Sequence, residues 1–147
     1  MSVTDSVEAR CPACGAESQA TVWRSINATL DPEAKTQLLA GTVNVFTCPK
    51  CRYESLLDID LLYHDMEQGF CVQYYPYERL GDDGFLAGFG LDGRPRFSVP
   101  EGMVLSEADY FTRPHIVFEL GELVRYVAFR DRLHELAAGG PPPEQPS

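Results

Sequence analysis

The sequence predicts an α+β fold, in which antiparallel strands take up most of the chain and one long helix follows them. Three observations support this fold class. Residues 18–28 and 57–63 alternate between apolar and polar side chains, as half-buried strands do. Residues 119–137 carry apolar side chains at helical spacing. Two Cys-Pro-x-Cys motifs, at residues 11–14 and 48–51, predict a tight turn at either end of a segment that contains two predicted strands and a short helix.

The two cysteine motifs indicate a metal site. Four thiolates in two such pairs can complete a tetrahedral shell, and zinc is its usual occupant. Gly15 follows the first motif and can adopt a positive φ, whereas Arg52 in the same place predicts a less ideal second turn. We expect a structural zinc site, with iron, disulfides and unliganded buried thiols as the alternatives. The candidate ligands are Cys11, Cys14, Cys48 and Cys51.

The segment between the motifs, residues 15–47, is longer than the roughly 15–20 residues of a short zinc ribbon and predicts structure of its own. Residues 18–28 form the first strand of this segment. Asp31, Pro32 and Glu33 have the character of a helix start, and Gly41 is a suitable helix stop. Residues 42–47 are predicted to be a strand that leads into the second motif.

Further antiparallel strands are predicted after the second motif. Residues 57–63 and 70–75 alternate in polarity around a turn at 65–69, which predicts an antiparallel pair. Asp92-Gly93 is a favoured two-residue turn and predicts a hairpin between 85–91 and 94–99. The other expectations are irregular chain at 81–84 and 100–105, and a short strand or the first turn of the helix at 115–118.

Several of these motifs together resemble the CpXC domain family. They are CPACG near the N-terminus, a long spacer with Asn27, Asp31-Pro32 and the LLAG of residues 38–41, and then FTCPKC. LLYHDMEQGF and an amphipathic helix follow, so the resemblance spans about residues 8 to 136. It implies a bacterial or other prokaryotic zinc-ribbon-like domain with the four cysteines as metal ligands. It implies no particular activity.

The expected organisation is a single domain over residues 8–137, of which 8–63 form the zinc-ribbon part and 64–137 the remaining strands and the helix. In full, this is a zinc-ribbon-like antiparallel sheet extended by further strands. A short helix lies between the cysteine motifs, and a C-terminal helix packs on the sheet. Residues 1–7 are expected to be flexible, and the Pro- and Gly-rich tail 138–147 to be disordered.

Charge and hydropathy exclude two classes of partner. The formal net charge of −10 opposes binding to phosphate backbones, so no nucleic-acid partner is expected. No apolar run approaches the roughly 20 residues of a membrane span, so no membrane partner is expected. Residues 1–10 lack the apolar core of a signal peptide, which favours a cytoplasmic protein with reduced cysteines.

We expect a non-catalytic, zinc-stabilised protein-interaction or adaptor module. Two alternatives remain open at this point. One is an enzyme with a pocket near His64 and Asp65 that also includes tyrosines of residues 74–77, and the other is a thiol-based redox or metal sensor. Cys71 lies in the middle of a predicted strand and is expected to be a buried thiol rather than a ligand.

The C-terminal helix has two apolar faces, although a surface helix normally needs only one. Either both faces are buried within one chain, or the first packs on the sheet and the second contacts a second copy or another protein. The first face carries Leu120, Leu123, Val124 and Val127, and the second carries Tyr126, Phe129, Leu133 and Leu136. The candidate partner-binding residues are Tyr126, Phe129, Arg130 and Leu133.

Overall fold

The computed structural model describes residues 2–96 and 113–138. Within these ranges it has a five-stranded sheet in the order β1-β2-β5-β6-β7 and a separate two-stranded sheet, β3-β4. The α+β class is therefore confirmed. The elements are β1 (Val3–Arg10), β2 (Glu17–Asn27), α1 (Pro32–Leu39), β3 (Val45–Thr47), β4 (Glu54–Leu56), β5 (Leu61–Asp65), β6 (Phe70–Tyr74), the 3-10 helix η1 (Tyr77–Gly81), α2 (Asp83–Leu86), β7 (His115–Val117) and α3 (Leu120–Ala138).

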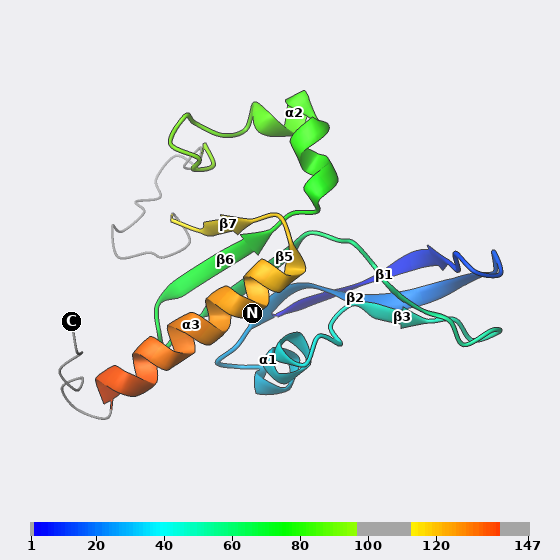
Figure 1. Ribbon diagram of the computed structural model, residues 1–147, viewed down its shortest axis with the longest axis horizontal. Coiled ribbons are helices and arrows are strands. Elements are labelled where there is room, and N and C mark those ends of the chain that lie inside the picture. The colour runs from blue at the N-terminus through cyan, green and yellow to red at the C-terminus, as the bar shows by residue number, and fades with distance from the viewer. Residues whose placement is uncertain (1, 97–112, 139–147) are drawn as a thin grey trace, which may run out of the picture.

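Strand β2 joins two parts of the molecule. It pairs antiparallel with β1 from Ser25 back to Glu17, and its last residues, 25–27, also pair in parallel with 62–64 of β5. The β1–β2 hairpin therefore projects beyond the main sheet, and the β3–β4 hairpin runs beside it (Figure 1). We call these two hairpins the arm. Its tips lie at the opposite end of the molecule from the C-terminal end of α3.

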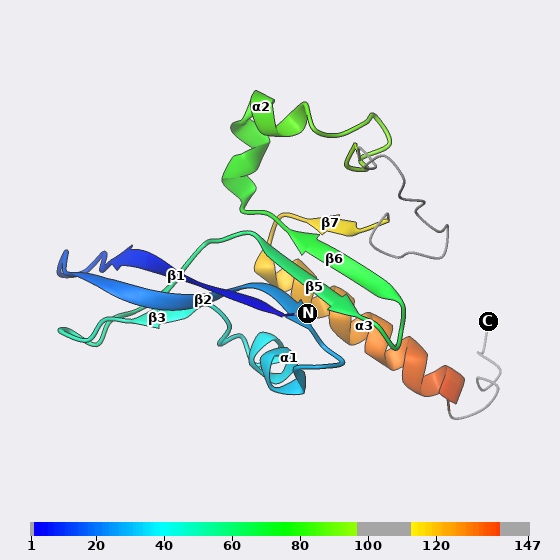
Figure 2. The same ribbon diagram turned by 180° about the vertical axis from the view of Figure 1, so that it is seen from behind.

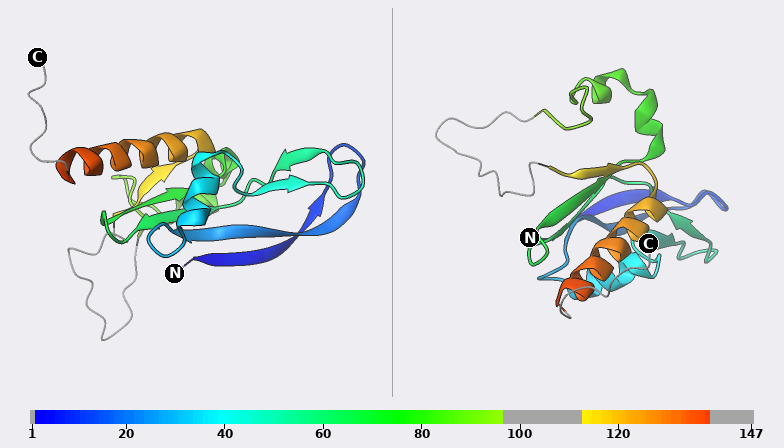
Figure 3. Two further views of the ribbon diagram at one scale, coloured as in Figure 1. Left: turned by 90° about the horizontal axis from the view of Figure 1, so that it is seen from below. Right: turned by 60° about the vertical axis from the view of Figure 1, so that its left-hand side comes forward.

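Helices α1 and α3 pack on the same side of the main sheet (Figure 3). Figure 2 shows the sheet from its other side, with α3 behind β5 and β6. Leu123 and Val127 of α3 are fully buried, and Leu120 and Val124 pack partly buried against the same core. The prediction that this face of the helix packs on the domain's own sheet is confirmed. No helix in the described ranges has the length and apolar character to cross a bilayer.

The side chain of Asn44 forms hydrogen bonds with the backbone of β2, as a residue of a neighbouring strand would. Its Oδ1 accepts the Trp23 N–H at 2.8 Å, and its Nδ2 donates to the Trp23 carbonyl at 3.1 Å. Its own carbonyl accepts the Leu57 N–H at 2.8 Å, and its φ is 54°. This left-handed conformation is one that Asn tolerates better than most residues. Asn44 thereby ties the β3–β4 hairpin to β2.

The sheet is mixed rather than purely antiparallel, which corrects the expected topology. The β5–β6 pair is antiparallel across the turn at 66–69, as predicted. The β2–β5 and β6–β7 pairs are parallel. Each parallel pair is joined by a long stretch of chain, and parallel neighbours require such a crossover because a tight turn can only reverse direction.

Residues 3–10 form strand β1, although residues 1–7 were expected to be a flexible N-terminus. Most of its side chains are exposed, so hydrogen bonds to β2 order this edge strand rather than burial. The strand expected at 57–63 is also different. Strand β4 ends at Leu56, residues 57–60 form a connection, and β5 starts only at Leu61. The strand expected at 42–47 is shorter and begins at Val45.

The region expected to be a loop and a hairpin is partly helical. Helices η1 and α2 occupy Tyr77–Gly81 and Asp83–Leu86, and the Asp82 side chain caps α2 by accepting the Phe85 N–H at 3.2 Å. The turn at Gly93 is present, but the hairpin is reduced to one isolated bridge between Phe89 and Pro95. Phe85 and Phe89 are four residues apart, so a helical turn brings both rings together, 5.1 Å apart. The expectations for 97–105 and for the tail beyond residue 138 lie outside the described residues.

The Asn44 bridge yields a stability prediction. Asn44→Gly keeps the left-handed backbone but removes both side-chain hydrogen bonds, so we expect the free energy of unfolding to fall by about 1–3 kcal/mol. Asn44→Ala should lose roughly 1 kcal/mol more, because a β-carbon is strained at this positive φ. Urea unfolding followed by circular dichroism measures both values. Wild-type stability in both variants would contradict the bridging role of Asn44.

Candidate metal centre

The four cysteines of the two motifs meet at the tips of the arm. Their Sγ atoms all lie within 4.8 Å of one another. Cys11 Sγ is 3.5 Å from Cys51 Sγ, and Cys14 Sγ is 3.7 Å from Cys48 Sγ. A tetrahedron with metal–sulfur bonds of about 2.3 Å has edges of about 3.8 Å. The four sulfurs can therefore hold one metal ion with only small movements.

The backbone of each motif folds in the same way. In the first, Cys11 donates its N–H to the Ala16 carbonyl at 2.9 Å, and its carbonyl accepts the Gly15 N–H at 2.8 Å. In the second, residues 48–53 repeat both hydrogen bonds at the equivalent positions, each at 2.9 Å. Each motif therefore places its cysteines by local hydrogen bonds at the end of a β-hairpin, independently of the other motif.

Arg52 adopts the conformation that Gly15 adopts in the other motif. Its φ is 64°, and that of Gly15 is 76°. The less ideal second turn expected from the sequence is therefore not seen in its hydrogen bonds. The cost lies instead in the backbone conformation, which is about 1–2 kcal/mol less favourable for a residue with a β-carbon.

Backbone N–H groups favour the thiolate form of the first cysteine of each motif, Cys48 and Cys11. The N–H of Cys51, and then that of Lys50, lower the pKa of the Cys48 thiol to about 6, although burial opposes this change. Burial raises the pKa of the Cys11 thiol, but the N–H of Cys14 and the adjacent sulfurs outweigh burial and leave the pKa lowered. Thiolate is the form of cysteine that binds metal.

Cys51 behaves in the opposite way. The N–H of Tyr53 lowers the pKa of the Cys51 thiol, but burial and the three neighbouring sulfurs outweigh it and raise this pKa to about 12. Four sulfurs at this distance cannot all be ionised without a compensating positive charge. A divalent cation at their centre would supply that charge and displace the remaining protons.

The inner and outer cysteines differ in exposure. Cys11 and Cys48, the first cysteine of each motif, are buried, whereas Cys14 and Cys51 are exposed. Cys11 and Cys48 form a small core cluster with Ala9 and Phe46, separate from the main core. The two inner ligands therefore belong to the interior of the arm, and the two outer ligands face solvent.

The other residues considered as sites lie apart from this cluster. Cys71 is a buried residue of β6, as predicted, and is not among the four clustered cysteines. His64 and Asp65 are 3% and 6% exposed, and burial lowers the pKa of His64. Asp65 Oδ1 accepts the Gln68 N–H at 2.9 Å and so caps the β5–β6 turn. Neither residue lines the pockets described below.

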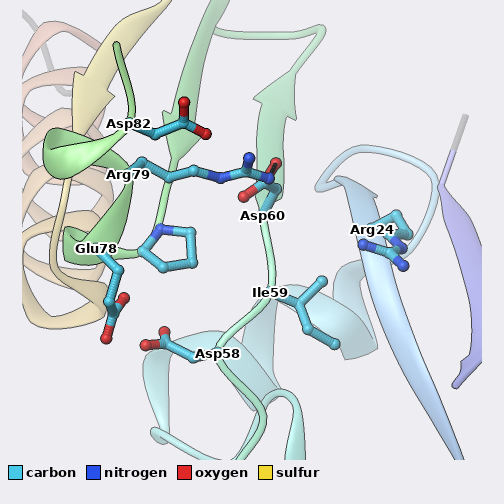
Figure 4. Close-up of a pocket in the computed structure, with 8 residues that line it drawn as sticks. Arg24, Asp58, Ile59, Asp60, Glu78, Arg79 and Asp82 are labelled. Carbon is cyan, nitrogen blue, oxygen red and sulfur yellow. Dashed lines mark hydrogen bonds and ion pairs between the residues drawn. The ribbon is translucent and has the colours of Figure 1, made fainter. Parts of the chain in front are cut away.

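A mixed-charge pocket that sequence reasoning did not predict lies between the 57–60 connection and η1 (Figure 4). Its volume is about 370 Å³. Arg79 forms an ion pair with Asp60 at 2.9 Å, and the Tyr74 hydroxyl donates to Asp58. Glu78 and Asp82 are close to Arg79 in the sequence, but Asp58 and Asp60 are not, and only the fold brings these two next to it. The lining residues are Arg24, Asp58, Ile59, Asp60, Pro76, Glu78, Arg79 and Asp82.

The four candidate partner-binding residues of α3 share one groove, which has a volume of about 340 Å³. Phe129 and Leu133 are 58% and 47% exposed. Tyr126 is half-buried and stacks on His115 with the ring centroids 3.9 Å apart. The second apolar face of the helix is thus only partly covered by the described residues. The groove residues are Gln68, Tyr126, Phe129, Arg130, Leu133 and His134.

The matching positions of Gly15 and Arg52 allow a paired test. Arg52→Gly should relieve the strain of a positive φ and raise the free energy of unfolding by about 0.5–1 kcal/mol. Gly15→Ala should lower it by about 1 kcal/mol or more, because it introduces the same strain. Unfolding curves and chelator competition measure stability and metal retention. If Arg52→Gly instead lowers stability or weakens metal retention, the Arg52 side chain itself supports the site.

Comparison with known proteins agrees with the geometry of this centre. A family model described as CpXC protein matches residues 9–84, more than half of the 147 residues. The matched region contains both cysteine motifs and the whole arm from Ala9 onward, and it ends before α3. Neither the curated proteins nor the solved structures gave a significant match. Since the model covers more than half of the chain and all four clustered cysteines, the chain belongs to the CpXC family.

Proposed function

We propose that the protein is a non-catalytic protein-interaction or adaptor module whose arm is held together by a structural zinc ion. The observation that carries the proposal is the set of four cysteine sulfurs within 4.8 Å of one another. Zinc is the usual ion for four thiolates, and a shell completed by protein leaves no position for a substrate. A reducing, cytoplasmic compartment would keep these cysteines as thiols.

A structural role is supported by the small size of the arm's own core. The cluster around the cysteines contains Ala9 and Phe46, with Ala16, Ala20 and Leu57 partly buried against it. So few apolar side chains, three of them alanine, bury little area, and most of the large buried side chains belong to the main core. Structural zinc contributes about 10–16 kcal/mol of apparent binding energy in small domains, so it can stabilise such a hairpin pair.

An interaction role is supported by the partly uncovered face of α3. Two large apolar side chains, Phe129 and Leu133, are exposed there beside Arg130. Aromatic residues and arginine are typical anchors of protein interfaces. The formal net charge of −10 becomes more negative by about 2 when four thiolates bind Zn²⁺, which argues against nucleic acid as the partner.

A redox or metal sensor is a second candidate, favoured by the exposure of Cys14 and Cys51. Exposed thiolates are accessible to oxidants and competing chelators. Release of zinc by mild peroxide, reversed by a thiol reductant and zinc, would favour this alternative. A structural site should keep its zinc under the same treatment.

The zinc proposal predicts one zinc ion per chain in the purified protein. Cys48→Ser should abolish zinc binding and unfold the arm, because it removes a buried ligand from a four-ligand shell. Cys71→Ser is the matched control and should keep full zinc content, because Cys71 lies outside the cluster. Elemental analysis checks all three proteins. Equal zinc loss in both variants, or a metal-free wild type, would contradict the proposal.

The interaction proposal predicts different effects for the two faces of α3. Phe129→Asp with Leu133→Asp should leave a folded, zinc-loaded protein, because both side chains are exposed. Val127→Asp is the control and should unfold it, because it buries an unpaired charge in the core. Circular dichroism and zinc content report folding. Cross-linked partners captured from the host by wild-type protein should be lost in the folded double variant. Capture of the same partners by the double variant would place their binding elsewhere.

A further inference from the structure

We propose that the α3 groove binds a protein segment that carries a carboxylate beside a large apolar side chain. This inference rests on the proposed function and specifies the chemistry of the partner. The groove is formed by Tyr126, Phe129, Arg130 and Leu133 with Gln68 and His134. Gln68 belongs to the β5–β6 turn, so the groove lies between that turn and the C-terminal half of α3.

The apolar part of the groove comes from three side chains. Phe129 lies 6.1 Å from Tyr126 between ring centroids, and Leu133 lies one helical turn beyond Phe129. Both Phe129 and Leu133 are about half exposed. A volume of about 340 Å³ is at the small end of ligand sites, which suits one or two side chains of a bound segment.

Arg130 supplies the charge, and its guanidinium is held in place. It lies 4.4 Å from the centroid of the Phe70 ring, and its Nη1 donates to the Tyr126 hydroxyl at 3.2 Å. No carboxylate of the described residues forms an ion pair with Arg130. A guanidinium that is oriented by an aromatic ring, but not neutralised, is well suited to receive a carboxylate in a bidentate hydrogen-bonded pair.

Two acidic residues near the groove each lie against another side chain rather than Arg130. Asp131 Oδ1 accepts hydrogen bonds from Lys35 Nζ and Gln68 Nε2, each at 2.8 Å. Glu67 Oε1 lies 3.9 Å from His134 Nε2. No carboxylate is among the groove-lining residues themselves. The groove thus presents Arg130 as a local positive charge on a chain whose net charge is −10.

This charge distribution favours an acidic and apolar segment over the other possible occupants. A basic segment would meet Arg130 directly and be repelled. A second copy of the chain would bring another net charge of −10 towards the first, and like net charges oppose association. A partner helix with a carboxylate one turn from a leucine or an aromatic residue would place both groups along the helical groove.

Selection of binding peptides tests this inference. A library of random short peptides is displayed on phage and selected on the zinc-loaded wild-type chain, and the selected peptides are synthesised with a fluorescent label. We expect Asp or Glu next to Leu, Phe or Trp to be enriched. Fluorescence anisotropy should show at least about tenfold weaker binding to Arg130→Glu, because a charge-assisted hydrogen-bonded pair is lost and replaced by repulsion. Binding should also weaken with added salt.

Arg132→Glu is the matched control, since Arg132 lies on the same helix, is exposed and does not line the groove. It should bind the peptides as the wild type does. Phe129→Asp provides a second test of the groove and should also lose binding while keeping its fold. Selected peptides without acidic residues, equal weakening by Arg130→Glu and Arg132→Glu, or a dimer that forms through this face in light scattering would each overturn the inference. A host partner that needs Phe129 and Leu133 but docks a basic or neutral segment would overturn it too, while leaving the proposed function intact.

Discussion

The double pairing of strand β2 is the constraint on which the rest of the structure depends. Its length is shared between the β1–β2 hairpin and the main sheet, but only residues 25–27 pair with β5. Three residue pairs therefore set the direction in which the arm leaves the body of the protein. The Asn44 side chain adds one more contact along the same edge of β2. It forms hydrogen bonds with the N–H and the carbonyl of Trp23, as a residue of a neighbouring strand would. The cysteine cluster, the β3–β4 hairpin and α1 all take their positions from this strand.

The body and the arm are stabilised by different physical means. The body buries large side chains such as Tyr63, Leu61 and Leu123 between the sheet and two helices. The arm has polar, largely exposed strands and a small cluster of its own. A metal ion bound at its tips would stabilise the arm without a large apolar core, because metal coordination does not require buried area. The division also separates the cysteine cluster from the α3 groove, because the tips of the arm and the C-terminal end of α3 lie at opposite ends of the molecule.

The sequence predicted those features that are encoded by neighbouring residues. The two cysteine turns, the start of α1 at Pro32 and its end before Gly41, the turn at 66–69 and the buried face of α3 are local signals, and the structure contains each of them. The parallel pairs were missed because they join residues far apart in the chain. Strand β1 was missed because an exposed edge strand needs no apolar alternation. The bridging role of Asn44 was missed because its partner, Trp23, is remote in sequence.

The two cysteine turns have the same hydrogen bonds, and each contributes one buried and one exposed cysteine to the cluster. The kinetics and the thermodynamics of a bound ion would then be governed by different residues. All four sulfurs would contribute to the equilibrium affinity for a bound ion. Exchange of the ion would proceed by stepwise ligand substitution from the solvent side, where Cys14 and Cys51 are accessible to an incoming thiol or chelator. The two buried cysteines, Cys11 and Cys48, would remain bound to the ion until the two exposed ones had been replaced.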